Sequence, residues 1–255
     1  MIEIIITLLF SSFNLGALGS IVLWQRIMNI GDALSHAVIF SLVIEYFFKL
    51  PPAFGCIIVA FIFTFSVRFL SKTSSGQNLS MIVFSSMLIA ITFLVSDLTN
   101  GDFRIKDFVM GDILSCGREE MYISIAISIL VGFFLYFKFN DLVLFSISED
   151  IAKVNSVNIK SLKIYISIIL ALAISLFIQV IGALLMTAFL VIPAAISRLV
   201  SNSPKTMMLF SIVISLTSSI ASFVISINYD ISFSASSIIL LSFMYLCANL
   251  MPSKR

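Results

Sequence analysis

Charged residues are scarce in this chain. Only 11% of its 255 residues are Asp, Glu, Lys or Arg, whereas 60% are hydrophobic. Soluble domains hold about 25% charged and about 45–50% apolar residues, so a water-soluble fold could not bury this much apolar surface. The composition therefore predicts an all-α, polytopic integral membrane protein in which residues 1–255 form a single transmembrane domain.

Cysteine is also rare, and Cys56, Cys116 and Cys247 show no C-x-x-C spacing. This argues against a disulfide framework and a thiolate zinc site. The patterns G-x-x-x-x-G-K-[ST], H-E-x-x-H and G-x-S-x-G are absent, so the chain carries none of these nucleotide-binding or hydrolytic signatures. Nothing in it indicates nucleic-acid binding. The first apolar stretch, Ile4 to Leu23, has no basic residue before it and is expected to be a retained span.

Long apolar runs are what the chain has in abundance. A helix needs about 20 predominantly apolar residues to cross a bilayer. We predict nine such spans, with eight as the alternative because the break at Ile181-Gly182 is short. The predicted spans are 3–24, 29–48, 53–71, 79–96, 121–138, 162–180, 182–200, 205–227 and 232–250.

The distribution of charge orients these spans. Cytoplasmic loops collect Lys and Arg, and an N-terminus outside places most of the fifteen basic residues on the inner side and most acids on the outer side. The acidic outer rim either concentrates cations at the mouth of a pore or simply reflects the basic inner side. The long outer loop 97–120 is predicted to hold a short helix that lies on the surface or dips inward.

The only histidine, His36, lies four residues after Asp32 in the second span. On a helix the two side chains share one face, about 5–6 Å apart at Cβ. Such a pair inside a bilayer is either a structural ion pair or cap, or part of a path for ions. Carboxylate and imidazole also form a partial ligand set for zinc or manganese. Ser35 is expected to add a hydroxyl on the same side, and Glu45 to line an access route near the outer end.

Other features indicate packing and bending. Serines recur at four-residue intervals in 205–227, which favours a helix–helix seam over a channel lining. Gly16 and Gly19 are expected to serve packing of the first span. Pro193 is predicted to kink the span 182–200, as a static bend or a hinge.

The inner loop, predicted over 139–161, contains a candidate short helix. Ser148 is placed to cap it, and Glu149 and Asp150 fall in its first turn, where acids complement the helix dipole. The alternative is an ordinary connecting loop.

The stretch G-D-A-L-S-H-A, Gly31 to Ala37, resembles a specific pattern of the permease subunits of metal-type ABC importers, the zinc, manganese and iron group, and most of all its zinc uptake members. Further segments resemble the same family in the same order, so the resemblance covers essentially the whole chain. These are G-D-I-L (Gly111 to Leu114), the inner loop from Glu149 to Val157, G-A-L-L-M-T-A-F-L-V-I-P-A-A-I-S-R-L (Gly182 to Leu199) and N-Y-D-I-S-F-S-A-S (Asn228 to Ser236).

The chain departs from the family's pattern at a few positions. Phe40 and Ser41 stand where the family usually has Pro-Gly, which predicts a less bent second span. Asn78-Leu79 replaces an Asp-Thr pair. In the inner loop, Ser148 replaces an Asp, and Ser156 replaces a Gly that ends the short helix.

The resemblance implies the other subunits of a transporter complex. Such permeases act as homodimers in the plasma (inner) membrane with two copies of a separate ATP-binding subunit, and receive metal from an extracytoplasmic binding protein. The chain would be a transporter subunit and no enzyme, with the divalent metal as cargo and no permanently bound cofactor. Asp32 and His36 would form a transient metal site between the halves. The inner-loop helix, with Glu149, Asp150, Ala152 and Lys153, would couple to the ATPase.

Two other functions compete with this one. An ion-coupled secondary transporter would use Asp32 and His36 as a proton relay and need no ATPase. An intramembrane hydrolase would pair Ser35 with His36, but adjacent residues point about 100° apart on a helix, which is poor geometry for a nucleophile and its base.

Overall fold

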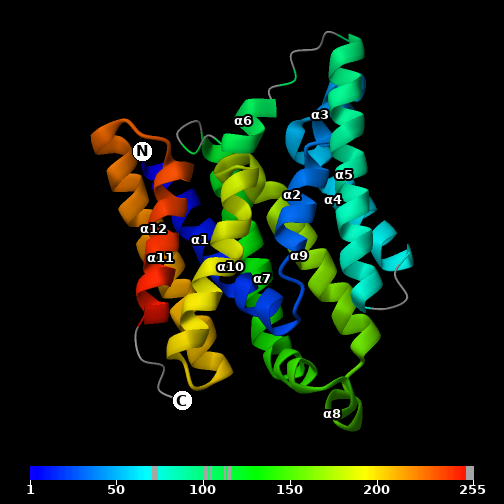
Figure 1. Ribbon diagram of the computed structural model, residues 1–255, viewed down its shortest axis with the longest axis vertical. Helices are drawn as coiled ribbons and strands as arrows, with labels where there is room; N and C mark the ends of the chain where they lie inside the picture. The colour runs from blue at the N-terminus through cyan, green and yellow to red at the C-terminus, as the bar shows by residue number, and fades with distance from the viewer. Residues whose placement is uncertain (71–73, 100–102, 104, 112, 114–115, 251–255) are drawn as a thin grey trace. The chain divides into compact units, whose positions relative to one another are not determined.

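The structure, a computed structural model, describes residues 1–250 except 71–73, 100–102, 104, 112 and 114–115. All regular elements in these residues are helices, which confirms the all-α prediction. The helices, drawn in Figure 1, are α1 (Ile2–Trp24), α2 (Ile30–Val38), α3 (Ser41–Phe48), α4 (Pro52–Leu70), α5 (Ser74–Thr99), α6 (Ile105–Met110), α7 (Arg118–Ile147), α8 (Glu149–Val154), α9 (Ile159–Ile181), α10 (Ala183–Val200), α11 (Pro204–Tyr229) and α12 (Phe233–Leu250).

The described helices account for all nine predicted spans. Eight are long and apolar enough to cross a membrane when α2 and α3 are taken together as Ile30–Phe48. A shorter apolar stretch, Ala53–Val67, lies in α4, where the third span was predicted. The short break at Ile181-Gly182 is a true helix boundary, because α9 ends at Ile181 and α10 begins at Ala183. Helix α4 as a whole has 19 residues, as many as Ile30–Phe48.

One predicted span is interrupted, and one predicted boundary is wrong. The second span is not one helix over 29–48. The N–H groups of Ile39 and Phe40 donate to the carbonyls three residues back, at His36 and Ala37, and these tight turns end α2 before α3 begins. The inner loop predicted from residue 139 begins later, because no helix breaker interrupts α7 before Ile147. An ion pair between Lys138 and Asp141, 2.8 Å long, lies within that extension.

The chain divides into two compact units. The first comprises Met1–Met28, Ile113–Ile169 and Ala188–Arg255, and the second comprises Asn29–Asp112 and Leu170–Thr187. Helices α9 and α10 each supply residues to both units. The predicted metal pair lies in the second unit, and the predicted coupling helix in the first.

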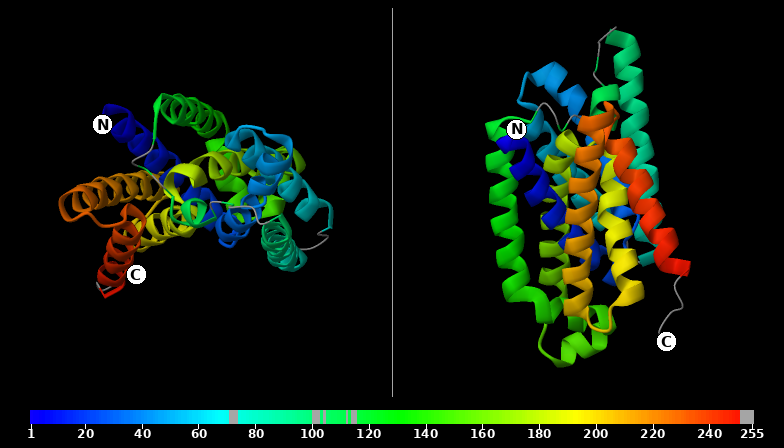
Figure 2. Two further views of the ribbon diagram at one scale, coloured as in Figure 1. Left: turned by 90° about the horizontal axis from the view of Figure 1, so that it is seen from above. Right: turned by 90° about the vertical axis from the view of Figure 1, so that its left-hand side faces the viewer.

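A seam of small polar residues joins α1 to α11 in the first unit (Figure 2). Ser211 donates its hydroxyl to the Gly16 carbonyl at 2.7 Å, and Ser215 donates to the Ser12 carbonyl at 2.8 Å. The partners move four residues along each helix in opposite directions, so the two helices run antiparallel in fixed register. The serine stripe is therefore a helix–helix seam, as predicted.

Helix α1 also contacts α7 and α10. Asn14, fully buried, donates to the Ser128 hydroxyl at 2.6 Å. Trp24, the only tryptophan, lies edge-on to Phe139 with ring centroids 6.0 Å apart. A Cβ at Gly19 would fall on the Leu190 carbonyl, so α1 and α10 touch backbone to backbone there. This confirms that Gly19 serves packing.

The second unit has its own polar cluster and its own close backbone contact. Cys56 of α4 lies 3.3 Å from the Ser41 hydroxyl of α3 and accepts a hydrogen bond from the Gln179 amide of α9 at 3.1 Å. Gly111 and Gly182 have positive φ angles of 69° and 89°, and a Cβ on either would meet the other's backbone. The end of α6 therefore packs directly on the break between α9 and α10.

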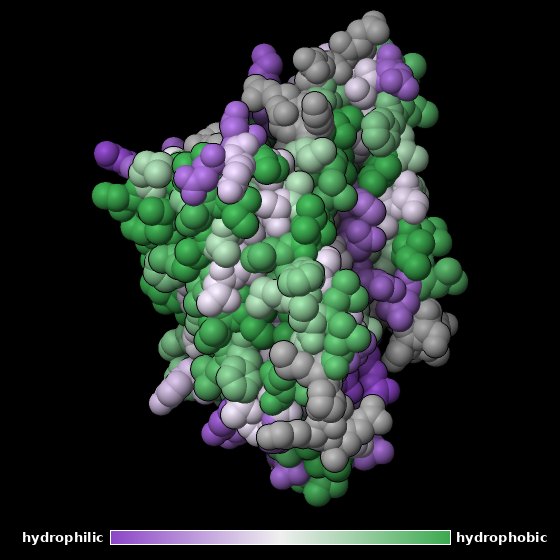
Figure 3. Space-filling model, turned by 60° about the vertical axis from the view of Figure 1, so that its left-hand side comes forward, coloured by the Kyte–Doolittle hydropathy of each residue, from purple (hydrophilic) through white to green (hydrophobic). Residues whose placement is uncertain are grey.

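The outer surface is suited to lipid. Large apolar side chains such as Leu209 of α11 and Phe243 of α12 are more than half exposed. Figure 3 shows a face of the molecule largely covered by hydrophobic residues, in green. A bilayer satisfies this exposed apolar surface, whereas water does not.

Candidate metal-transport site

Helix α2 carries the predicted metal pair. It begins at Ile30, so Asp32 lies in its first turn and not at the N-cap, which is Asn29. His36 lies in its last turn. An acid in the first turn complements the helix dipole. The alternative that Asp32 caps the helix is therefore wrong.

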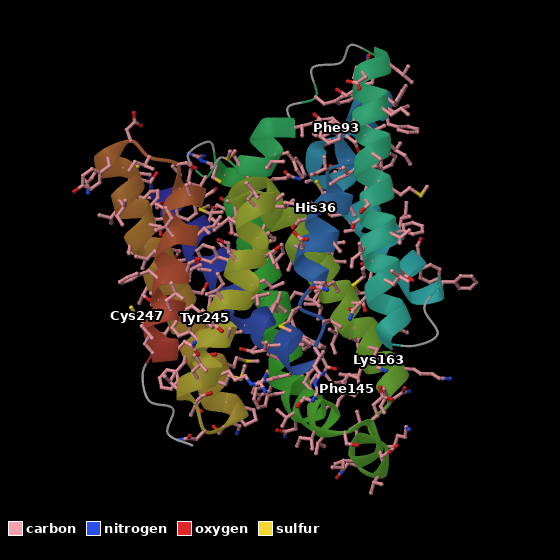
Figure 4. The ribbon with its side chains drawn as sticks, viewed as in Figure 1. His36, Phe93, Phe145, Lys163, Tyr245 and Cys247 are labelled. Carbon is pink, nitrogen blue, oxygen red and sulfur yellow. The ribbon has the colours of Figure 1, made fainter. Side chains whose placement is uncertain are left out.

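Asp32 and His36 form the exposed polar face of an otherwise buried helix. Their side chains are 61% and 44% exposed, while the residues between and beside them are buried. The His36 Nε2 lies 3.8 Å from the Asp32 Oδ1, a loose contact that is too long for a hydrogen bond. Figure 4 labels His36 on α2. The carboxylate oxygens of Asp32 and the ring nitrogens of His36 are therefore accessible to a ligand.

Ser35 does not join this face. Ser35 is completely buried, with 0% exposure. Its hydroxyl has no hydrogen-bond partner among the described residues. The expectation that Ser35 adds a ligand on the same side is wrong. One helical step turns it about 100° from His36 and into the protein. The same orientation removes it as a nucleophile for the competing hydrolase.

Glu45 lies on α3, partly exposed, in the last turn before Lys49 ends that helix. The turn at Ile39-Phe40 separates it from α2, so Glu45 and His36 do not lie on one continuous helix. Its role in an access route stays a prediction.

One protomer supplies a small donor set. Among the residues that the structure describes, His, Cys, Asp and Glu side chains form no group of three or more that could hold a metal ion. A bound zinc ion usually takes four ligands. The pair alone therefore suits transient contact with a cation and not permanent retention.

The predicted coupling residues are real parts of a short helix, α8. Ser148 caps it by accepting a hydrogen bond from the Asp150 N–H at 3.2 Å, as predicted. Glu149 pairs with Lys163 at 2.5 Å, and Asp150 pairs with Lys153 at 3.0 Å. Ala152 is completely buried, so it holds the helix in place and cannot present itself to a partner.

Pro193 lies inside α10, which continues through it from Ala183 to Val200. It is buried, four residues from the Phe189 carbonyl that it leaves without its usual helical donor. Whether α10 hinges there stays a prediction.

Known proteins resemble this chain along nearly its whole length. The family model described as "ABC 3 transport family" matches residues 1–251. The chain belongs to the ABC 3 transport family. The high-affinity zinc uptake system membrane protein ZnuB of Buchnera aphidicola subsp. Schizaphis graminum is 31% identical over 243 residues, covering 94% of this chain and 93% of that protein.

More distant relatives of this ABC 3 family member include the manganese transport system membrane protein MntC of Halalkalibacterium halodurans, which is 22% identical over 94% of this chain and 83% of that protein. Among solved structures, PsaBC from Streptococcus pneumoniae in complex with Fab matches with a TM-score of 0.85 at 22% identity, covering 99% of this chain and 91% of that one. This likeness supports the arrangement of helices described above.

Two sets of contacts in this family member were not predicted from the sequence. Gly111 and Gly182 occur in segments that resemble the family's pattern, yet only the structure shows that they touch. Lys163 looks like one of several inner basic residues, and its contacts with Glu149 and the Phe145 ring come from chain reversal between α7 and α9. Neither contact leaves a periodic signal in the sequence.

Proposed function

We propose that the chain is the membrane-spanning subunit of an ATP-driven importer that passes a divalent metal ion, zinc first and manganese second, into the cytoplasm by alternating access. The membrane would be the plasma (inner) membrane. The observation that carries this proposal is the exposed pair of Asp32 and His36 on a helix whose other faces are buried. The names of the ZnuB and MntC relatives support the cargo.

A second copy of the chain would complete the metal site. Most soluble homo-oligomers are two-fold dimers, and we extend that symmetry to this membrane protein. The same exposed α2 face from two copies would supply two carboxylates and two imidazoles. This donor set suits zinc and is acceptable to manganese. A cation held by paired, half-exposed side chains can also leave, which transport requires.

The other partners would be an ATP-binding subunit on the inner side and an extracytoplasmic metal-binding protein on the outer side. Asp150 and Lys153 of α8 are exposed and would contact the ATP-binding subunit. Glu45 would lie along the route by which metal arrives. The chain itself would hydrolyse no ATP and hold no permanent cofactor.

The proposal is tested in vesicles that contain the chain with its ATP-binding subunit. We expect ATP-dependent zinc uptake in the parent protein and at least a ten-fold loss in His36→Ala and in Asp32→Asn, because each removes a ligand. Asn29→Ala changes an exposed residue beside α2 that makes no side-chain cap, and uptake should stay within two-fold of the parent.

Circular dichroism and size-exclusion chromatography of each variant establish that the fold and the dimer persist. Unchanged uptake in folded His36→Ala protein would remove the site. Zinc uptake by the chain alone, driven by a proton or sodium gradient, would replace the ATP-driven importer with the secondary transporter.

A further inference from the structure

The short helix α8 cannot hold its own position. It has only six residues, and isolated helices shorter than about 12–15 residues are marginal in water. Its two connections are brief, with Ser148 joining it to α7 and residues 155–158 joining it to α9. Contacts with neighbouring helices must therefore set its direction.

The Lys163 amine of α9 provides two such contacts, one with α8 and one with α7. The Lys163 Nζ, from α9, lies 2.5 Å from the Glu149 Oε1 at the first position of α8. The same Nζ lies 5.2 Å from the centroid of the Phe145 ring, which belongs to the last turns of α7. Figure 4 labels Phe145 and Lys163 close to α8. All three residues belong to the first unit.

The opposite side of α8 is exposed. Val154 is 85% exposed, and the Asp150 side chain is 88% exposed. The ion pair of Asp150 with Lys153 stays within α8 and fixes nothing outside it. The helix thus has an anchored side, with buried Ala152 and paired Glu149, and a presented side, with Val154 and Asp150.

Fold stability does not explain the Lys163 contacts. The side chains of Lys163 and Glu149 are 42% and 51% exposed, and exposed ion pairs contribute little to the free energy of folding. Their effect on the position of α8 is more important, because they connect the start of α8 to both α7 and α9. A cation over an aromatic face adds direction to that tie.

We propose that Lys163 is a positioning residue that fixes α8 against the inner ends of α7 and α9, so that force applied to the presented side of α8 reaches both long helices. This inference rests on the proposed function, in which α8 meets the ATP-binding subunit. Glu149 then acts within the permease, and Val154 and Asp150 face the partner.

The first measurement needs no partner and no transport. Amide hydrogen exchange of residues 149–157 is compared in the full-length parent, Lys163→Gln and Lys163→Arg proteins in lipid nanodiscs. We expect exchange to rise about three-fold or more in Lys163→Gln and to stay at the parent level in Lys163→Arg, which keeps the charge. Equal exchange in Lys163→Gln and the parent would overturn the proposal.

The second measurement is the amount of zinc moved per ATP hydrolysed by the complete complex in vesicles. We expect this ratio to fall about three- to ten-fold in Lys163→Gln and in Glu149→Lys while ATP hydrolysis continues. The exchanged pair Glu149→Lys with Lys163→Glu should recover part of the ratio, because it restores the ion pair but not the cation over the Phe145 ring. Lys205→Gln is the matched control, since Lys205 is an exposed lysine in the first turn of α11 that forms no ion pair among the described residues.

The two measurements separate the inference from the function on which it rests. A parent complex that moves no zinc with ATP would overturn the proposed function. Hydrogen exchange would still test whether Lys163 fixes the position of α8. A raised exchange with an unchanged zinc-to-ATP ratio would overturn the positioning role of Lys163. A fall in the Glu149→Lys ratio that the exchanged pair does not recover would also overturn it.

Discussion

The two compact units of this protein differ in their internal packing. The first unit rests on long helices, α1, α7 and α11, whose small polar side chains bond directly to facing backbone or side-chain atoms. The second unit contains interrupted helices, with tight turns between α2 and α3 and a glycine break between α9 and α10. The exposed acid–imidazole pair lies in the interrupted unit.

This difference teaches where function is placed. Helix breaks within a bilayer are tolerated only where the freed backbone groups are buried in protein or line a cavity. Membrane transporters commonly build substrate sites on such discontinuous helices. The proposed metal ligands, Asp32 and His36, therefore lie in the unit whose helices are interrupted, and the first unit has long helices in fixed register.

The largest effects are expected from a methyl group at the two backbone contacts. Gly19→Ala in the first unit places its Cβ on the Leu190 carbonyl, and Gly182→Ala in the second places it on the α6 backbone at a positive φ of 89°. Overpacking and left-handed strain together cost about 3 kcal/mol or more. Both variants should unfold at lower temperature in detergent, as followed by circular dichroism.

Trp24 separates the two variants. It packs beside Leu23, Ala194 and Met207, and Ala194 is also the neighbour of an added Cβ at position 19. Its fluorescence emission should shift in folded Gly19→Ala protein and stay unchanged in folded Gly182→Ala protein. Gly132→Ala is the control, because its Cβ would meet nothing within 4 Å. A Gly19→Ala protein as stable as this control would disprove the tight α1–α10 seam.

A smaller effect is expected from the polar contact between α1 and α7 in the first unit. Asn14→Ala removes the buried bond to Ser128 and should lower the free energy of unfolding by about 1–2 kcal/mol, with a coupling of about 0.6 kcal/mol in a double-mutant cycle with Ser128→Ala. Chemical unfolding in detergent measures both. Thr217→Ala is the control, since the exposed Thr217 hydroxyl bonds only within its own helix. Zero coupling would mean that the bond between Asn14 and Ser128 does not contribute to the packing of α1 on α7.

The first unit was also the easier one to anticipate from sequence. Its serines and glycines recur with helical spacing, so the seam could be predicted from periodicity alone. The interruption at Ile39-Phe40 could not, because neither residue is a helix breaker and the tight turns depend on tertiary packing. The spacing of Asp32 and His36 predicted a shared face, whereas the burial of Ser35 depended on neighbouring helices that the sequence does not reveal.

The smallest effect is expected at Ser156, where the first unit contains its own short helix. Ser156 ends α8 at a φ of 59°, while its N–H donates to the Lys153 carbonyl at 2.9 Å and the Val157 N–H donates to the Ala152 carbonyl at 3.0 Å. This is a Schellman ending, which favours glycine. The glycine that the resembled family has here is thus explained by backbone geometry.

Ser156→Gly should stabilise the protein by about 1 kcal/mol or less, because relief of left-handed strain is partly offset by a more flexible unfolded chain. Thermal unfolding measures the gain, and Ser167→Gly, in the interior of helix α9, should instead destabilise by about 0.5 kcal/mol. A loss of stability in Ser156→Gly would show that the serine side chain contributes more to the turn than its strained backbone costs.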